Sequence, residues 1–371
     1  MKKILLTITM IAILLTGCGK GSLVSSPTVE LKPTFDAPVT EIIEVKLSAT
    51  GDVTMGNYVG QEYSNSFNQM YDSTGDYGYF FKNVANYFAE DDFTIVNLEG
   101  CLTTSNNPAP GRTYNIKGDP SYTNILLEGN VEAVGMENNH RRDFEQEGTR
   151  DTVAALEAAN LPYAYNENLG YYEVNGIKIG WVAVNAASWG ASVEPTLEEG
   201  LKKLSEECDL VLSCCHWGIE REYYPTAYQR ELGKKCIDWG ADLVIGHHPH
   251  VLQGMEEYNG KIILYSLGNF SFGANKNPSD KDTMIYQQTF KFAKTTAGNG
   301  EVTISLLDET EANMIPCSIS SVSSRNDYCP TPLTGSEGQR VINRMNTFSK
   351  DFGIHVDENG VIEWTTESAN E

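Results

Sequence analysis

Residues 240–250 read GADLVIGHHPH, and this stretch decides the fold. Its centre, 243–245, is an apolar run that predicts a short buried strand, and the strand ends in a glycine followed by three histidines. The residues before it, 228–239, carry the apolar spacing of a helix, and Gly240 is a typical residue just past a helix C-terminus. A helix that leads into a buried strand is the repeating unit of α/β proteins.

The same order of strand and polar cluster occurs five more times along the chain. In α/β sheets, ligand sites form where strands end at their carboxyl termini, so these clusters are expected to meet at one edge. The predicted strands and the polar residues that follow them are 45–49 with Asp52, 93–96 with Asn97 and Glu99, 131–134 with Asn139 and His140, 210–215 with His216, and 261–267 with Asn269.

The pattern changes after about residue 283. Residues 284–292 and 302–307 are rich in β-formers with no helix between them, which predicts antiparallel strands that complete a sheet. One helix near 337–348 and a hairpin turn at 357–360 follow. We therefore expect one α/β domain over 43–318 and a C-terminal extension of a helix and a hairpin over 319–371.

The N-terminus has the pattern of a bacterial export signal. Lys2 and Lys3 precede an apolar run at 4–15, which is too short for a comfortable membrane-spanning helix. The run ends in Leu-Thr-Gly-Cys, which resembles a lipobox with Cys18 as the lipidated residue. The prediction is a signal peptide over 1–17, a tether over 18–42 and a lipid-anchored location outside the cytoplasmic membrane; the alternative is an ordinary export signal with a chance cysteine.

Charge and cysteine content restrict the possible partners. The formal net charge is -23, with 27 Lys and Arg against 50 Asp and Glu, and no basic run is present. Nucleic acid is excluded as a partner because its binding rests on clustered basic side chains. An anionic polymer can approach only where bound cations supply positive charge. Seven cysteines remain after Cys18, an odd number without regular spacing, so no disulfide framework is predicted and a Cys317–Cys329 pair stays open.

The histidines point to metal chemistry. The chain has only six, and five of them stand in the clusters that follow predicted strands: His140, His216, His247, His248 and His250. Histidine nitrogen together with carboxylate and amide oxygen suits divalent cations that keep open coordination positions. Such donors on several strand ends are typical of a two-metal site, where a pair of cations activates water and holds the oxygens of a displacement.

These motifs, in this order, resemble the CapA family of poly-γ-glutamate capsule biosynthesis proteins. The resemblance covers roughly 45–275 and implies a fold similar to calcineurin-like metallophosphoesterases, a sandwich of two mixed β-sheets flanked by helices. It also implies a role in building or exporting that surface polymer. The motifs are Gly51-Asp52-Val53-Thr54-Met55-Gly56, Asn97-Leu98-Glu99-Gly100, Asn138-Asn139-His140, His216-Trp217-Gly218-Ile219-Glu220, the run from Gly240 to Gln253, and Ser266-Leu267-Gly268-Asn269-Phe270.

The resemblance implies a role for each site residue. The metal ligands would be Asp52, Glu99, Asn139, His216, His248 and His250, and they would hold two divalent ions, Mn, Fe, Zn or Mg. His140 would protonate a leaving group and Asp143 would orient it. Residues that bind substrate or position ligands would be Asn97, Lys117, Glu220, His247 and Asn269. Two departures stand out: no histidine follows two residues after Asp52, and Lys117 stands where an arginine is usual.

Two hypotheses for function follow. The first is a metal-dependent hydrolase in which metal-bound hydroxide attacks a phosphoester or an amide and His140 gives a proton to the leaving group. The second is a non-catalytic accessory lipoprotein that binds polyglutamate or capsule synthesis and export proteins. A γ-glutamyl-bond hydrolase is a third option. The missing histidine near Asp52 favours the second hypothesis, whereas the histidine cluster favours the first.

Overall fold

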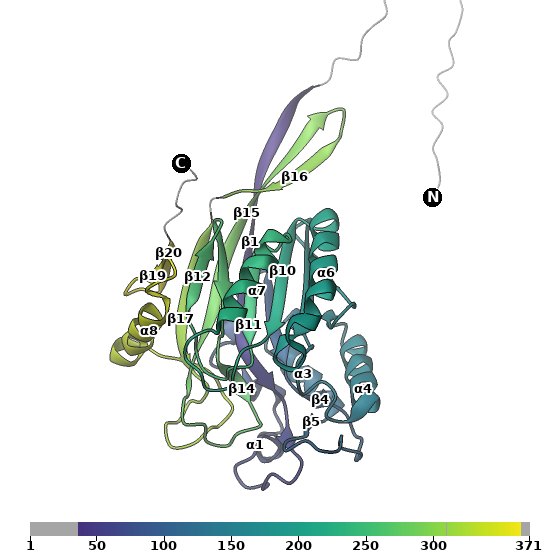
Figure 1. Ribbon diagram of the computed structural model, residues 1–371, viewed down its shortest axis with the longest axis vertical. Coiled ribbons are helices and arrows are strands. Elements are labelled where there is room, and N and C mark those ends of the chain that lie inside the picture. Colours follow the sequence, from purple (N-terminus) through teal and green to yellow (C-terminus); the bar gives the residue numbers. More distant parts are fainter. Residues whose placement is uncertain (1–35, 309, 365–371) are drawn as a thin grey trace, which may run out of the picture.

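Two mixed β-sheets pack face to face, and helices cover their outer faces (Figure 1). The computed structural model describes residues 36–308 and 310–364. The predicted fold class, an α/β sandwich of two mixed sheets flanked by helices, is confirmed. Cys18, the signal peptide and most of the predicted tether lie outside the described residues, whereas 36–42 form the start of the first strand.

The larger sheet is built around strand β1, which pairs in parallel with β3 and β14 and antiparallel with β15. Its order is β19-β20-β17-β15-β1-β3-β6-β7, with β14, β16 and β18 beside β1, β15 and β17. The strands are β1 Asp36–Thr54, β3 Phe93–Leu98, β6 Ala133–Gly135, β7 Tyr163–Ala164, β14 Asn269–Phe272, β15 Asp282–Gly298, β16 Val302–Leu306, β17 Glu311–Ser318, β18 Thr331–Pro332, β19 Ile354–Val356 and β20 Val361–Trp364.

The second sheet has a parallel centre with one antiparallel strand at each edge. Its strands, in spatial order, are β12 Met255–Tyr258, β13 Lys261–Leu264, β11 Leu243–His247, β10 Leu210–His216, β9 Ile177–Asn185 and β8 Gly170–Val174. A small third sheet contains β2 Asn57–Tyr58, β5 Ile116–Gly118 and β4 Cys101–Leu102.

The helices divide between the two outer faces. Those against the larger sheet are α1 Phe67–Thr74, α2 Ala85–Ala89, α3 Thr123–Glu128 and α4 Glu145–Ala158, and those against the second sheet are α6 Glu194–Glu207 and α7 Ala227–Asp238. The short α5 Ala186–Trp189 follows β9, and α8 Gly335–Ser349 lies at the C-terminal side (Figure 1). Within the described residues, no helix is long and apolar enough to cross a membrane.

Alternation of side chains along the strands produces three apolar layers. In β9, Ile179 and Trp181 point into the core between the sheets, whereas Val182 and Val184 pack against the helices on the other side. In β1, Leu47 joins the same central core from the opposite sheet. Full burial of such a side chain contributes roughly 1.5–3 kcal/mol. A shift of one residue in strand register would expose these side chains, so the apolar pattern fixes the register of each strand.

The C-terminal extension completes the larger sheet. The hairpin β19–β20 joins the sheet because β20 pairs with β17, and α8 packs against β17 and β19. Ion pairs hold the helix in place, since Arg340 and Arg344 both bind Asp282 at the start of β15, at 2.6 and 2.5 Å. Cys317 and Cys329, whose pairing the sequence left open, are free buried thiols.

One half-buried carboxyl outside the histidine motifs makes stability depend on pH. Glu132 precedes β6, and burial raises its pKa to about 7, against the smaller opposing effect of the hydrogen bond from Thr94. The folded state therefore holds a proton that the unfolded state releases near pH 4.5, so stability is lost as pH rises from about 4.5 to about 7. In Glu132→Gln this loss should shrink, as measured by urea unfolding at several pH values with chelator present. Exposed Glu128 is the matched control, and Glu128→Gln should keep the wild-type pH dependence.

Candidate metal centre

The strand register brings the predicted site residues to one end of the sandwich. In the larger sheet, Asp52 of β1 pairs with Asn97 of β3 and with Asn269 of β14. In the second sheet, His216 of β10 pairs with His247 of β11. The strands that carry these residues are parallel within each sheet, so their carboxyl ends lie together. The side chains at these ends therefore converge at one end of the sandwich.

Glu99, just past β3, is the centre of this cluster. It is fully buried, and neither of its carboxylate oxygens has a hydrogen-bond partner among the described residues. Its Oε1 lies 3.9 Å from Nε2 of His140 and 3.8 Å from Nε2 of both His216 and His250. Burial raises the pKa of Glu99 to about 7, because an ionised carboxylate without partners is costly in a protein interior. A cation among these atoms would supply the missing partner, so the residues fit a metal ion.

His250 presents its Nε2 to this position because its other nitrogen is occupied. Nδ1 donates to Oδ1 of Asn269 at 2.9 Å and lies 3.2 Å from Oδ2 of Asp52. The Asn269 amide is itself oriented, since its Nδ2 donates to the carbonyl of His250. Burial alone would lower the pKa of His250, but the charge of Glu99 and the bond to Asp52 raise it to about 10. A proton on His250 thus offsets the negative charge of the nearby carboxylates.

His216, His248 and Asn139 form the other half of the cluster. Nε2 of His216 lies 2.8 Å from Oδ1 of Asn139, and the rings of His216 and His248 are 4.7 Å apart. Nδ1 of His248 is buried and has no hydrogen-bond partner among the described residues. Burial lowers the pKa of His216 well below its usual value and that of His248 to about 4. Both rings are therefore neutral, which is the form that binds metal.

The loop after β11 aims its histidines through an unusual backbone. His248 and His250 have φ values of 99° and 58°, in the left-handed region that side chains other than glycine seldom adopt. The two residues stand two positions apart in this loop, and their ring centroids are 5.9 Å apart. Backbone strain of this kind is typical of functional sites, where surrounding structure compensates for it.

Ligand-type atoms gather in two groups that share His250. Asp52, Glu99 and His250 form the first group, and Glu220, His248 and His250 form the second; within each group the atoms lie within 4.8 Å of one another. The bond to His250 and the charges of His247 and His250 outweigh burial and lower the pKa of Asp52, which keeps it ionised. The six residues that the sequence predicted as metal ligands thus lie together at one end of the fold, near Glu220.

Two predicted residues position the ligands. Asn97 donates through Nδ2 to Oδ1 of Asp52 at 2.8 Å and accepts through Oδ1 from Asn138 at 3.2 Å, so both ends of its amide are occupied. His247 donates through Nε2 to the carbonyl of Thr50 at 3.0 Å, which ties β11 to β1 across the two sheets. Both side chains therefore hold the strand ends that carry the ligands.

His140 is oriented by Asp143. Its Nδ1 lies 2.7 Å from Oδ2 of Asp143, and its Nε2 faces Glu99. Asp143 is fully buried, and it also accepts from the backbone N–H of Ile116 and from Arg112, at 2.6 and 2.9 Å. Burial lowers the pKa of His140, but the bond to Asp143 and the charge of Glu99 outweigh this effect and raise it. His140 can therefore hold a proton at Nε2, directed at the cluster.

The arginine that contacts this loop is Arg112, which the sequence interpretation missed. Arg112 binds the carbonyl of Asn139 as well as Asp143. Lys117, the predicted substitute for an arginine, instead donates to Ser105 and Asn106. In the sequence, the only sign of a special role for Arg112 is its place in a turn-like stretch between Gly111 and Thr113, which is a weak signal.

A cavity opens in front of the cluster. Its volume is about 340 Å³, and we refer to it as the metal-side cavity. Tyr58 and Tyr114, whose rings meet edge to face at 5.1 Å, lie on its wall. The residues that line it are Tyr58, Gln61, Tyr114, Ile116, His140, Glu220, Arg221, His250, Phe272, Ala274, Asn275 and Lys276. The aromatic and basic members of this lining also escaped the sequence interpretation.

Two mixed sheets whose strand ends gather histidine, carboxylate and amide donors define a metallophosphoesterase-like protein. Within this class, residues 46–274 match the family model of the bacterial capsule synthesis protein PGA_cap. Because the match covers more than half of the chain, the protein belongs to that family.

Individual relatives agree with this assignment. The chain is 29% identical to the capsule biosynthesis protein CapA of Bacillus anthracis over 264 residues, which are 64% of this chain and 62% of that protein, less than two thirds of its length. It is 28% identical to the PGA biosynthesis protein CapA of Bacillus subtilis over 290 residues, 72% of this chain and 73% of that protein. A probable polyglutamine synthesis accessory protein of Mycobacterium tuberculosis is 24% identical over 208 residues, 48% of this chain and 55% of that protein.

Solved structures overlap more loosely. The TT1561 protein of Thermus thermophilus is 12% identical, with a TM-score of 0.35 that covers 66% of this chain and 94% of that one. Chaetomium thermophilum Vps29 is 11% identical, with a TM-score of 0.21 that covers 62% of this chain and 96% of that one.

Removal of the central carboxylate should abolish tight metal binding. Glu99→Gln keeps the shape of the side chain but removes its charge, so Mn²⁺ affinity measured by calorimetry should fall by at least about 10- to 100-fold, the loss typical of even an indirect partner. At a metal concentration a hundred times the dissociation constant, the wild-type protein should gain about 2.7 kcal/mol of stability, and the variant should gain almost none. Glu132→Gln, a carboxyl outside the cluster, is the control and should bind metal normally. Equal affinity for Glu99→Gln and the wild type would contradict the assignment.

Proposed function

We propose that this protein acts at the cell surface in the biosynthesis or export of poly-γ-glutamate, and that its metal centre hydrolyses a bond of that polymer or of a phosphoester. Family membership and the names of its capsule-related relatives support the first part. The second part rests on one observation, the buried Glu99 carboxylate, which has no hydrogen-bond partner among residues 36–308 and 310–364 and faces the Nε2 atoms of three histidines.

The donor set suits two divalent cations. Asp52, Glu99 and His250 would hold one ion, and Asn139, His216 and His248 would complete the site of the other. Mixed nitrogen and oxygen donors of this kind accept Mn, Fe, Zn or Mg. When bound, such ions lower the pKa of water and neutralise charge that develops on the attacked group.

The side chains around the centre have separate tasks in this scheme. His140 holds a proton at Nε2 and delivers it to the leaving group, while Asp143 keeps the ring in place through Nδ1. Arg221 and Lys276 line the metal-side cavity and attract an anionic substrate. Local cations of this kind are required, because the chain as a whole carries a net charge of -23 and repels polyanions.

The proposed location rests on the N-terminal sequence. Residues 1–17 would direct export and Cys18 would carry the lipid anchor, so that the protein lies on the outer side of the cytoplasmic membrane. At that location it would meet the secreted polymer and the capsule synthesis and export proteins.

A specific observation favours the alternative function, an accessory protein that binds the polymer without cleaving it. Thr54 occupies the position two residues after Asp52 where related phosphoesterases carry a histidine. Its Oγ1 is buried and has no hydrogen-bond partner among the described residues. Threonine supplies one weak oxygen donor in place of a nitrogen ligand, which weakens the ion site that contains Asp52.

Two substrates that differ in their leaving group distinguish catalysis assisted by His140 from simple binding. An alkoxide leaves poorly without a proton, whereas nitrophenolate leaves as an anion. His140→Ala should therefore slow hydrolysis of an alkyl phosphodiester by about 10²–10⁴-fold, while a nitrophenyl phosphodiester should be affected much less. Steady-state kinetics on metal-loaded protein, together with the chain length of added polyglutamate, provide the measurement.

The histidine outside the site provides the control. His355 is exposed on β19, and His355→Ala should leave both rates unchanged. Equal losses on both substrates would exclude a proton-donating role for His140. Absence of turnover on phosphodiesters and on polyglutamate alike, with metal bound, would favour the accessory function.

A further inference from the structure

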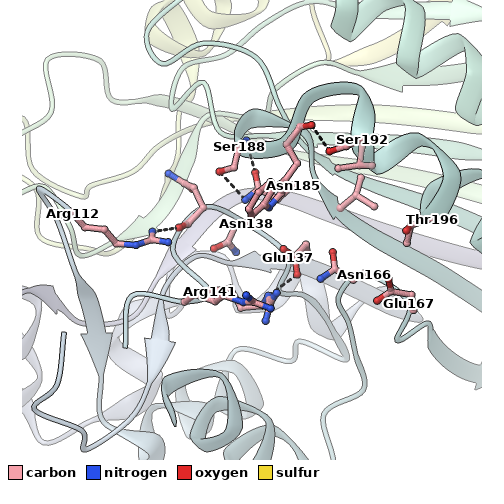
Figure 2. A pocket seen from close by; sticks show the side chains of 15 residues that line it. Arg112, Glu137, Asn138, Arg141, Asn166, Glu167, Asn185, Ser188, Ser192 and Thr196 are labelled. Atoms are coloured by element: carbon pink, nitrogen blue, oxygen red, sulfur yellow. Dashed lines mark hydrogen bonds and ion pairs between the residues drawn. The ribbon is translucent and has the colours of Figure 1, made fainter. Parts of the chain in front are cut away.

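A second cavity lies beside the metal centre. Its volume is about 280 Å³, and Asn138 and Asn139 of the loop that carries His140 form part of its wall. We call it the arginine cavity. It contains three guanidinium groups, although acidic residues outnumber basic ones almost two to one in the whole chain. Figure 2 shows Arg141 and Glu137 on one side of this cavity and Asn185 and Ser188 on the other.

The three arginines differ in what they are free to bind. Arg112 pairs with Asp143 at 2.9 Å, and Arg141 pairs with Glu137 at 2.5 Å. Arg142, between Arg141 and Asp143 in the sequence, is exposed and has no ion-pair or hydrogen-bond partner for its side chain in the described part of the chain. Its guanidinium is therefore available for an external carboxylate, which it can bind through two parallel hydrogen bonds.

The remaining wall suits an amide-linked chain. The Asn166 side chain has no hydrogen-bond partner within the described residues, so its amide is available to a backbone amide of a ligand. Trp189 is 62% exposed at the end of α5 and offers a flat apolar surface to methylene groups. A free guanidinium, a free amide and an exposed aromatic ring together match a repeating unit of carboxylate, amide and methylene.

The loop over 138–143 separates the arginine cavity from the metal-side cavity. Asn139 links the arginine cavity to the histidine cluster, since it lines that cavity and its Oδ1 lies 2.8 Å from Nε2 of His216. Arg112 lines the same cavity and holds Asp143, the partner of His140. A polymer that crosses this loop would place one unit at the metal centre and a neighbouring unit beside Arg142.

We propose that the arginine cavity is a second binding subsite for an anionic polyamide, in which Arg142 pairs with a carboxylate of a unit next to the one held at the metal centre. This inference rests on the proposed function, because it takes the polymer bound at that centre as the ligand. It assigns Arg142, Asn166 and Trp189 to substrate binding. It also explains how an acidic protein can hold a polyanion along several units.

Binding of oligo-γ-glutamates of defined length to the full metal-loaded chain tests the subsite. A single glutamate unit reaches only the metal centre, whereas oligomers of two or more units also reach Arg142. Arg142→Gln and Trp189→Ala should each weaken binding of these oligomers by about tenfold, the loss expected for one charge-assisted contact, and leave binding of the single unit unaffected. Arg150→Gln, an exposed arginine of α4 outside both cavities, is the matched control and should bind all lengths normally.

The outcomes separate the inference from the proposed function. If the wild-type protein binds oligomers but Arg142→Gln and Trp189→Ala bind every length equally well, the subsite is absent and the proposed function stands. If the wild-type protein binds no oligo-γ-glutamate of any length, both fall. Inorganic polyphosphate provides the last arm, since binding of polyphosphate through Arg142 without binding of polyglutamate would overturn the polyamide assignment.

Discussion

The site depends on one physical constraint, a buried carboxylate that finds no hydrogen-bond partner in the described part of the chain. Glu99 is fully buried, and three histidine nitrogens surround its Oε1 at 3.8–3.9 Å. Such a group is stable in the interior only with a compensating charge, and a proton on His250 offsets the charge of the carboxylate. A divalent cation meets the same requirement better, since it satisfies the carboxylate and the neutral histidines together.

The two packed sheets together hold the side chains of the site at one end of the fold. Asp52 and Asn97 come from the larger sheet and His216 from the second, so no single sheet contains the centre. His247 links the sheets directly through the carbonyl of Thr50. The apolar core between the sheets therefore controls the distances at the site, because a slip of one residue in either sheet would turn the ligands away.

Much of the fold was predictable because its strands are short, apolar and buried. Of the predicted elements, the strand at 243–245 became β11 and the helix at 228–239 became α7, within one or two residues. The short helices α1 and α3 and the three-stranded sheet were not predicted, because segments of two to eight residues carry too little periodicity. The lipid anchor and the tether up to residue 35 remain predictions, since they lie outside the described residues, whereas 36–42 belong to β1.

The sequence by itself predicted which residues gather at the site, because histidine, carboxylate and amide donors follow the carboxyl ends of buried strands, where α/β sheets form ligand sites. Tertiary structure alone decided how they are oriented. Three features depend on contacts between distant segments. The first is the left-handed backbone at His248 and His250, and the second is the Asn269 bond that leaves Nε2 of His250 free. The third is that Arg112, and not Lys117, contacts the loop that carries His140. Side-chain orientation is set by such contacts, and strand periodicity carries no information about them.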